Sequence, residues 1–272
     1  MKNLLPILLV FFFGQVLSIT SLAAKNETEL YLTVFHKKGT VFAYKGTKSV
    51  RQIKKNDKVY VGETVHSKDK SLLVLEFSNK SKLKVDANSI IRIEKLINER
   101  MEKGGDHKNS LVLKLGSVFM KYVNKQKEEN FVLKTRSASM GVRGTEFFAH
   151  IGGPREEKLA MTVNEGVVVV SSEFKSEQRE VSKSFGTLVK SDGSIVEKKQ
   201  FKWSQKLNWN QDPEEGNLET PAEVFKQIEA DWDLYAKDVE ERRDQFFQNQ
   251  EDQFKKYQQH ADPFKDQEDP FK

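Results

Sequence analysis

The side chains that most often carry out chemistry are present in this sequence, but their spacing assembles no catalytic site. Five histidines are spread along the chain: His36, His66, His107, His150 and His260. They share no metal-ligand spacing with one another or with carboxylates. Because the sequence contains no cysteine, thiolate zinc sites and cysteine nucleophiles are excluded. The residue pattern therefore predicts no metal centre, no cofactor and no enzyme.

Two serine–lysine motifs and one carboxylate pair are the remaining catalytic candidates. Ser67–Lys70 and Ser172–Lys175 have the Ser-x-x-Lys spacing of penicillin-binding enzymes, but the companion Lys-Thr-Gly element is absent. We interpret both matches as chance. Glu156 and Glu157 lie in loop-like surroundings, where a solvated surface is expected. A cell-wall polysaccharide-acting enzyme with an unrecognised carboxylate site stays as an alternative, which two carboxylates at glycosidase spacing in a cleft would support.

Residues 1–24 have the pattern of a secretory signal peptide. A singly basic lead precedes an apolar run from Leu4 to Leu17, and small residues follow at 21–24. The run falls short of the ~20 apolar residues that span a bilayer, so we expect cleavage after Ala23 or Ala24 rather than a retained anchor. The sequence predicts an exported protein with no later membrane span, located in the periplasm of a Gram-negative bacterium.

Charge is distributed unevenly between the two parts of the chain. Residues 1–211 hold 37 basic and 22 acidic side chains, whereas residues 212–272 hold 18 acidic and 8 basic ones. The lysines are scattered and often alternate with apolar residues, as in Lys82–Asp86, which is typical of a solvated sheet face. We therefore expect no nucleic-acid partner, but an unidentified envelope protein or an anionic envelope polymer.

The pattern of residues 30–197 predicts one all-β domain of many short strands. Runs of β-branched and aromatic residues, such as 31–35, 72–77 and 167–170, are separated by Gly, Asn, Asp and Lys. No segment between them has helical periodicity. The polar segment Glu99–Asn109 is interpreted as an exposed loop.

The pattern changes from strands to helices after Lys198. Residues 198–211 predict a short helical exit segment, and residues 220–259 an amphipathic charged helix that opens with a capping threonine, a proline and a glutamate. Its apolar stripe consists of Phe225, Ile228, Trp232, Tyr235, Val239 and Phe246. Arg242 and Asn249 interrupt the stripe, which argues against a long homo-oligomeric coiled coil. We expect the stripe to dock on the β-domain or on a partner, and residues 260–272 to be disordered.

The stretch Thr135–His150, TRSASMGVRGTEFFAH, is the most patterned part of the chain. Gly141 and Gly144 bracket Val142 and Arg143, and strand-like residues lie on both sides. Because no helix follows, a bend between two strands is favoured over a phosphate-binding loop. Arg143 is expected to tie this bend to a neighbouring carbonyl or carboxylate.

These residues resemble the signature of the FecR domain family. The resemblance runs in order over about 30–196, including 56–63 and 75–81, and is most specific in its Val-Arg-Gly-Thr-x-Phe block. The motif residues are Gly141, Val142, Arg143, Gly144, Thr145, Phe147, Glu165 and Gly166. The resemblance implies an all-β periplasmic module of bacteria.

The best-known activity of that family does not follow from the resemblance. Its namesakes are transmembrane anti-sigma regulators with a cytoplasmic helical segment before the membrane span, whereas three residues precede the apolar run here. We therefore expect a non-enzymatic exported protein that binds an envelope component or partner protein, in envelope signalling or organisation. A sensor that acts through a separate membrane protein is a second alternative.

Overall fold

The computed structural model describes residues 30–46, 48–97, 108–123, 131–152 and 158–260. The expected signal peptide, most of the expected loop Glu99–Asn109 and the tail beyond residue 260 lie outside these ranges, as do Glu156 and Glu157. Within them the chain forms 14 strands, one 3-10 helix and one α-helix. The strands are β1 (Tyr31–Lys38), β2 (Val41–Lys45), β3 (Lys48–Gln52), β4 (Lys58–Tyr60), β5 (Thr64–Ser67), β6 (Leu72–Glu76), β7 (Lys82–Val85), β8 (Ile90–Lys95), β9 (Asn109–Lys121), β10 (Phe131–Lys134), β11 (Ala138–Ile151), β12 (Leu159–Ser172), β13 (Gln178–Ser182) and β14 (Gly186–Val189).

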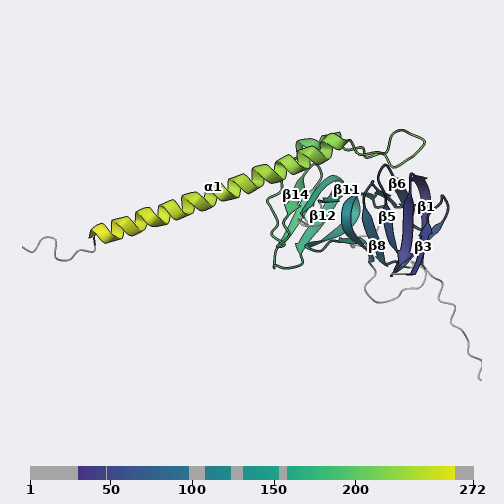
Figure 1. Ribbon diagram of the computed structural model, residues 1–272, viewed down its shortest axis with the longest axis horizontal. Coiled ribbons are helices and arrows are strands. Elements are labelled where there is room, and N and C mark those ends of the chain that lie inside the picture. Colours follow the sequence, from purple (N-terminus) through teal and green to yellow (C-terminus); the bar gives the residue numbers. More distant parts are fainter. Residues whose placement is uncertain (1–29, 47, 98–107, 124–130, 153–157, 261–272) are drawn as a thin grey trace, which may run out of the picture.

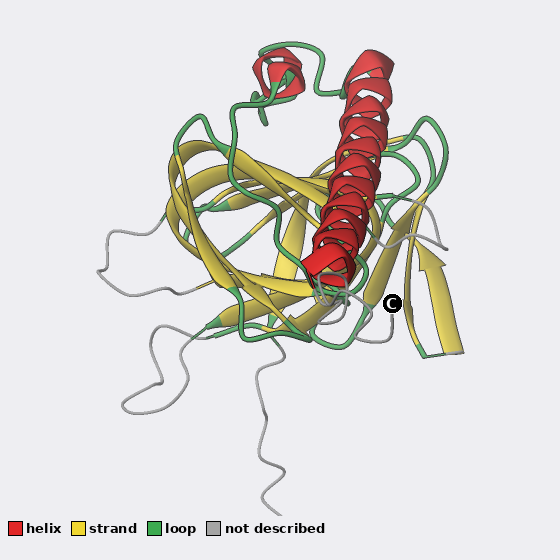
Figure 2. Ribbon diagram, turned by 90° about the vertical axis from the view of Figure 1, so that its left-hand side faces the viewer, coloured by secondary structure: helices red, strands yellow, loops and turns green. Residues whose placement is uncertain are grey.

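All 14 strands belong to one sheet that curls around a core (Figure 2). The main path runs β13-β12-β11-β10-β9-β7-β6-β1-β4. The long strand β9 connects the two parts of the sheet, since its first half pairs with β8 and β10 and its second half with β7 and β11. The β9–β10 pairing is parallel, whereas the other pairings are antiparallel. The predicted all-β architecture is confirmed.

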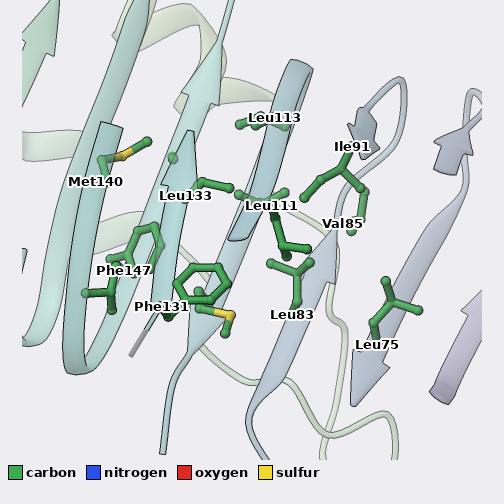
Figure 3. Packing of buried hydrophobic residues seen from close by; sticks show 14 of the residues in the cluster. Leu75, Leu83, Val85, Ile91, Leu111, Leu113, Phe131, Leu133, Met140 and Phe147 are labelled. Atoms are coloured by element: carbon green, nitrogen blue, oxygen red, sulfur yellow. The ribbon is translucent and has the colours of Figure 1, made fainter. Parts of the chain in front are cut away.

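The inner face of the sheet holds the main hydrophobic core. Alternate residues of a strand point to the same face, so inward side chains recur with a period of two. Figure 3 shows this packing for side chains from β6 to β11: Leu75, Leu83, Val85, Ile91, Leu111, Leu113, Phe131, Leu133, Met140 and Phe147. The burial of these residues gives a disulfide-free chain its stability.

The outer face is also apolar where β9, β11, β12 and β14 run side by side. Phe119 lies between the inward residues Val118 and Met120, and it packs against Phe148 with ring centroids 4.7 Å apart. Ala160 and Leu188 complete this outer surface. A sheet that is apolar on both faces must be covered on both. In this protein the C-terminal part of the chain supplies the outer cover.

The outer cover is built from η1 (Lys202–Lys206) and α1 (Ala222–His260). Trp203 of η1 is fully buried between the sheet and the helix, where Val224, Ile228 and Trp232 meet the same cluster. The long C-terminal helix predicted from the sequence is thus confirmed. Figure 1 shows that only its first part lies over the strands, while the remainder projects well beyond them.

We predict that the docked part of α1 contributes directly to the stability of the fold. Ile228 is 1% exposed in the outer cluster, so Ile228→Ala leaves a cavity and should lower the free energy of unfolding by about 2–4 kcal/mol. Val239 is half-buried on the same stripe, and the matched change Val239→Ala should cost less than about 1 kcal/mol. Urea denaturation measures both changes, and equal effects would contradict the docking.

Candidate functional site

The described residues contain no cluster of three or more His, Asp and Glu side chains that could hold a metal ion. Among the same residues, no helix combines the length and apolar character needed to cross a membrane. Three other features are candidates for a functional site: the patterned stretch in β11, the two halves of α1, and the segment that links α1 to the sheet.

The patterned stretch is a β-bulge inside one continuous strand. Strand β11 runs from Ala138 to Ile151, and its pairing with β12 shifts register between Arg143 and Glu146. The hydroxyl of Thr145 lies 2.7 Å from the carbonyl oxygen of Arg143 and 3.0 Å from that of Val167. The expected bend between two separate strands is therefore wrong, because the extra residue is absorbed within a single strand.

Two glycines face each other at this bulge. Gly144 has φ 51° and Gly166 has φ 81°, both in the left-handed region. A Cβ atom on Gly166 would lie 2.7 Å from the carbonyl oxygen of Gly144 and 2.9 Å from Oγ1 of Thr145. The close approach of β11 and β12 thus requires glycine at position 166.

The side chain of Arg143 does not make the predicted tie. It is exposed, and it forms no hydrogen bond or ion pair with any described residue. The hydroxyl of Thr145 bridges the two strands instead. Val142 and Phe147 point into the inner core, whereas Glu165 is exposed. Gly141 pairs with Val132 and Val169 within the ladder.

The predicted stripe of α1 divides into a docked part and an uncovered part. Ile228 and Trp232 are buried in the outer cluster, and Phe225 and Tyr235 are half-buried against it. Val239 is also half-buried, but Phe246 is 57% exposed. Docking on the β-domain therefore accounts for only the first half of the stripe.

Polar contacts orient the docked half of α1. The indole Nε1 of Trp203 donates a hydrogen bond of 3.0 Å to Oδ2 of Asp231, and Nζ of Lys199 lies 3.4 Å from Oδ1 of the same carboxylate. Nζ of Lys190 lies 4.9 Å from the ring centroid of Tyr235, a cation–π contact. These contacts fix the helix register above an otherwise non-directional apolar surface.

The helix beyond Val239 is uncovered by the described chain. Every residue from 240 to 256 is exposed, including the aromatic residues Phe246, Phe247 and Phe254, at 57%, 59% and 62%. Three large aromatic side chains on a projecting helix form an apolar surface that water solvates poorly. We call residues 240–256 the projecting half of α1.

The segment between the two helices, residues 207–221, forms a strap across the outer face of the sheet. Leu218 of this strap packs on Leu72 and Val74 of β6. The ammonium group of Lys84 donates hydrogen bonds to the carbonyl oxygens of Asn208 (2.9 Å) and Leu218 (2.8 Å). One lysine of β7 therefore holds both ends of the strap.

Lys84 is fully buried, although the sequence pattern predicted a solvated lysine. Leu83 and Val85 point inward, so Lys84 points outward as expected, but the strap covers it. Its Nζ also lies 3.6 Å from the ring centroid of Phe119. The strap residues that cover it are more than 120 positions away in the sequence, so no local signal identifies Lys84.

Asp86 anchors the strap beside Lys84. The hydroxyl of Thr220 donates a hydrogen bond to its Oδ2, just before α1 begins. Burial raises the pKa of Asp86 to about 6, while Lys84 and the Thr220 hydrogen bond act in the opposite direction. Burial likewise lowers the pKa of Lys84 to about 8, and the Asp86 carboxylate opposes this shift.

His150 lies under the first turns of α1. Its ring centroid is 5.1 Å from that of Phe225, and its Nδ1 is 2.8 Å from the hydroxyl oxygen of Ser117. Burial lowers the pKa of this imidazole to about 4. His150 is therefore neutral in the folded protein at pH 7, which suits its place among aromatic rings.

Comparison with known proteins identifies the β-domain. Residues 63–169 match the family described as FecR protein, and this match includes β5 to β11 and most of β12, with the whole glycine-marked bulge. The chain contains a FecR domain. The strands β1–β4, β13 and β14 lie outside the matched residues, but they complete the same sheet as the FecR domain.

Solved structures provide a second comparison for the FecR-domain protein. Two crystal structures of a proposed anti-sigma factor from Parabacteroides distasonis, at 1.65 and 2.50 Å resolution, match it with a TM-score of 0.40 each. Their sequences are 18% and 17% identical to this one, and each match covers 50% of this chain. This chain matches 59% of the length of those proteins. No curated protein matches the chain.

The bulge of the FecR domain predicts a large loss of stability for one substitution and almost none for another close to it. Gly166→Ala places a methyl group against the Gly144 carbonyl at a positive φ, so it should lower the free energy of unfolding by about 2 kcal/mol or more. Arg143→Ala, at an exposed position, should change it by less than about 0.5 kcal/mol. Thermal and urea denaturation test both, and a marked loss of stability in Arg143→Ala would restore the structural role first expected for it.

The strap predicts a pH-dependent difference between the wild-type protein and Asp86→Asn. Because the pKa of Asp86 is about 6 when folded and 3.8 in an ordinary aspartate, the folded state binds the extra proton between these values. The stability that Asp86 contributes is therefore fully present below about pH 4 and is lost as pH rises through about 6, by up to about 3 kcal/mol.

Urea unfolding of both proteins between about pH 4 and pH 7 measures this effect. The free energy of unfolding of wild type minus that of Asp86→Asn should fall as pH rises. His150 has a lowered pKa and acts in the opposite direction, but it is present in both proteins and cancels in the difference. A difference that does not vary with pH would contradict the buried, strap-anchoring state of Asp86.

Proposed function

We propose that this FecR-domain protein is an exported, non-enzymatic binding protein of the bacterial cell envelope. It acts in the periplasm of a Gram-negative bacterium, where it binds a partner protein or envelope component in signalling or organisation. The FecR domain provides a rigid base, and α1 presents the contact surface. The observation that carries this proposal is the apolar stripe of α1, which continues uncovered into the projecting half.

The length of α1 supports a role in binding rather than in folding alone. The outer cluster needs the helix only as far as Tyr235 to cover Phe119, Phe148 and their neighbours. The helix nevertheless continues to His260, more than twenty residues further. Isolated helical segments are marginally stable in water unless their apolar face is covered. The projecting half of α1 is therefore suited to contact a second molecule through its apolar face.

The arrangement of buried carboxylates supports a non-enzymatic role. Among the described residues, the buried carboxylates are Glu63, Asp86 and Glu146. Glu63 pairs with Arg51 at 2.9 Å, Asp86 accepts from Thr220, and Glu146 accepts from Asn164. Each of these three buried carboxylates thus holds a structural partner within the fold.

The charge distribution supports an envelope setting for the contact. Residues 1–211 have a net charge of +15 and residues 212–272 a net charge of −10. Of the acidic residues, Glu219, Glu223 and Asp231 form ion pairs with lysines of the body, namely Lys38, Lys206 and Lys199. The body keeps an excess of basic residues that would attract anionic envelope polymers, and this attraction weakens as salt rises.

We predict that binding in the envelope depends on the aromatic residues of the projecting half. Tagged protein purified from an envelope extract should retain its partner, whereas the double variant Phe246→Glu, Phe254→Glu should lose most of it, since two charges are placed on the apolar surface. Quantitative mass spectrometry of the co-purified material measures the loss.

The matched control is the double variant Gln245→Glu, Gln248→Glu. It adds the same charge to the same part of the helix, but on the face away from the stripe, because successive residues are rotated by about 100°. This control should bind like the wild type. Equal recovery of every component with both double variants would contradict a role for the stripe.

A further inference from the structure

Part of the sheet has an outer face that the C-terminal part of the chain does not cover. The first halves of β9 and β11 and the second half of β12 pair with β8, β10 and β13 in the order β8-β9-β10-β11-β12-β13. Four outward valines of these strands are only half-buried, and they belong to none of the buried apolar clusters: Val112, Val132, Val167 and Val169. By contrast, Phe119 and Phe148 are fully buried beneath η1 and α1. We call this uncovered outer surface of β8–β13 the open face.

Basic side chains form a band along the strands of the open face. Six of them lie on β8, β9, β10 and β11 or directly before these strands: Arg92, Lys95, Lys108, Lys114, Lys134 and Arg143. The strand register places Arg92 on one side of Val112 and Lys134 on the other. Because a strand rises about 3.3 Å per residue, the stretch from Lys108 to Lys114 is about 20 Å long. We call these six residues the basic band.

The acidic residues of the protein leave half of the basic band without a partner. Glu94 is the one carboxylate on β8, β10 and the first halves of β9 and β11, and it lies 2.7 Å from Nζ of Lys134 and 2.6 Å from the hydroxyl oxygen of Ser110. The ion pairs between the acidic C-terminal segment and the body involve lysines outside the band. Three members of the band form no hydrogen bond or ion pair with any described residue: Arg92, Lys114 and Arg143.

Two shallow hollows follow each other along the basic band. The first has a volume of about 400 Å³, and its lining includes Lys95, Lys108, Ser110 and Lys134. The second has a volume of about 310 Å³, and its lining includes Val112, Lys114 and Arg136. Cations that line successive hollows attract several anionic groups spaced along a chain, whereas a single bound phosphate requires cations that converge on one point.

We propose that the open face binds a linear anionic polysaccharide, whose charged groups lie along the basic band. The inference rests on the proposed envelope setting, but not on the contact through α1. Charge complementarity selects an anionic chain. Neutral groups beside the band suit sugar hydroxyls, since the half-buried Ser139 and Ser171 lie next to each other on β11 and β12, and Ser139 lies beside Lys134.

Two other anionic partners fit the open face less well. No described aromatic side chain lines either hollow, so the bases of a single-stranded nucleic acid would find no ring to stack on. None of the exposed large apolar side chains of the described chain belongs to β8–β13. Nothing on these strands would therefore insert among the acyl chains of a membrane.

Arg143 acquires a role at the open face. It belongs to the most specific block of the FecR signature, yet its guanidinium is exposed and makes no contact that stabilises the fold. Its backbone pairs with Val167, and its side chain lies at the same end of the band as Lys108. A guanidinium binds a carboxylate or phosphate through two parallel hydrogen bonds, so Arg143 is suited to hold one anionic group of the polysaccharide.

Fluorescence anisotropy with the purified full-length protein tests the site. Two labelled probes carry anionic groups on a sugar chain: oligogalacturonate, which has carboxylates, and dextran phosphate. The wild type should bind at least one of them at low salt and lose affinity as salt rises. The triple variant Arg92→Gln, Lys114→Gln, Arg143→Gln should bind that probe at least about tenfold more weakly, because half of the band is removed.

The matched control is the triple variant Lys55→Gln, Lys202→Gln, Lys226→Gln. It removes the same charge from exposed positions outside the basic band, and it should bind within about twofold of the wild type. Urea denaturation should give the same unfolding midpoint for both triple variants, since all six side chains are exposed. Equal losses of affinity in the two variants would show that net charge alone attracts the probe, and would overturn the site.

Three further probes identify the class of ligand. Uncharged dextran should not bind, and single-stranded DNA and vesicles that contain phosphatidylglycerol should bind more weakly than the anionic sugar chain. Tighter binding of the DNA or of the vesicles would overturn the polysaccharide as the occupant. The absence of binding to both anionic sugar chains at low salt would overturn the inference altogether.

This inference and the proposed function fail in different ways. The double variant Phe246→Glu, Phe254→Glu should bind the anionic sugar chain like the wild type, because the open face lies apart from the projecting half of α1. If no anionic sugar chain binds, but this double variant still loses an envelope component, the proposed function stands without the open face. If the sugar chain binds as described and the double variant loses no component, the contact through α1 is overturned and the open face remains.

Discussion

Strands β9, β11 and β12 are apolar on both faces, and most of the structure follows from the need to cover both. Their inward side chains close the main core, while Phe119, Phe148 and Ala160 point the opposite way and would otherwise meet water. The 3-10 helix, the strap and the first half of α1 provide the second cover. Because this cover comes from the C-terminus of the chain, a fixed connection must cross the sheet, and Lys84 holds that connection at both ends.

Burying the charged side chain of Lys84 is unfavourable in itself, but from this position the ammonium group can hold the strap. Removing an ammonium ion from water is costly unless hydrogen bonds and nearby charge compensate, and here two carbonyl oxygens, an aromatic face and Asp86 supply this compensation. The same arrangement fixes where α1 begins, since Thr220 binds Asp86 immediately before the first helical turn. The FecR domain, the strap and the helix base are thus one packed unit, from which only the second half of α1 departs.

Local patterns in the sequence predict the secondary-structure elements well, but they do not predict the contacts between those elements. The strands, the long helix and the FecR signature are recognisable because alternation, helical spacing and glycine positions act over a few residues. The strap contacts of Lys84 span more than 120 residues, so alternation alone suggested a solvated side chain. The same limit applies to Arg143, whose flanking glycines suggested a structural tie, whereas Thr145 makes the bridge. Phe247 and Phe254 gain importance only once the structure shows where the sheet ends.

Hydrogen exchange along α1 tests most directly the claim that the helix has a docked half and a projecting half. Residues 224–235 should be protected nearly as strongly as the strands beneath them, at every protein concentration. Residues 240–256, which are exposed along the projecting helix, should exchange rapidly. Uniform protection along the whole helix would contradict this division into two halves, and so would rapid exchange within 224–235.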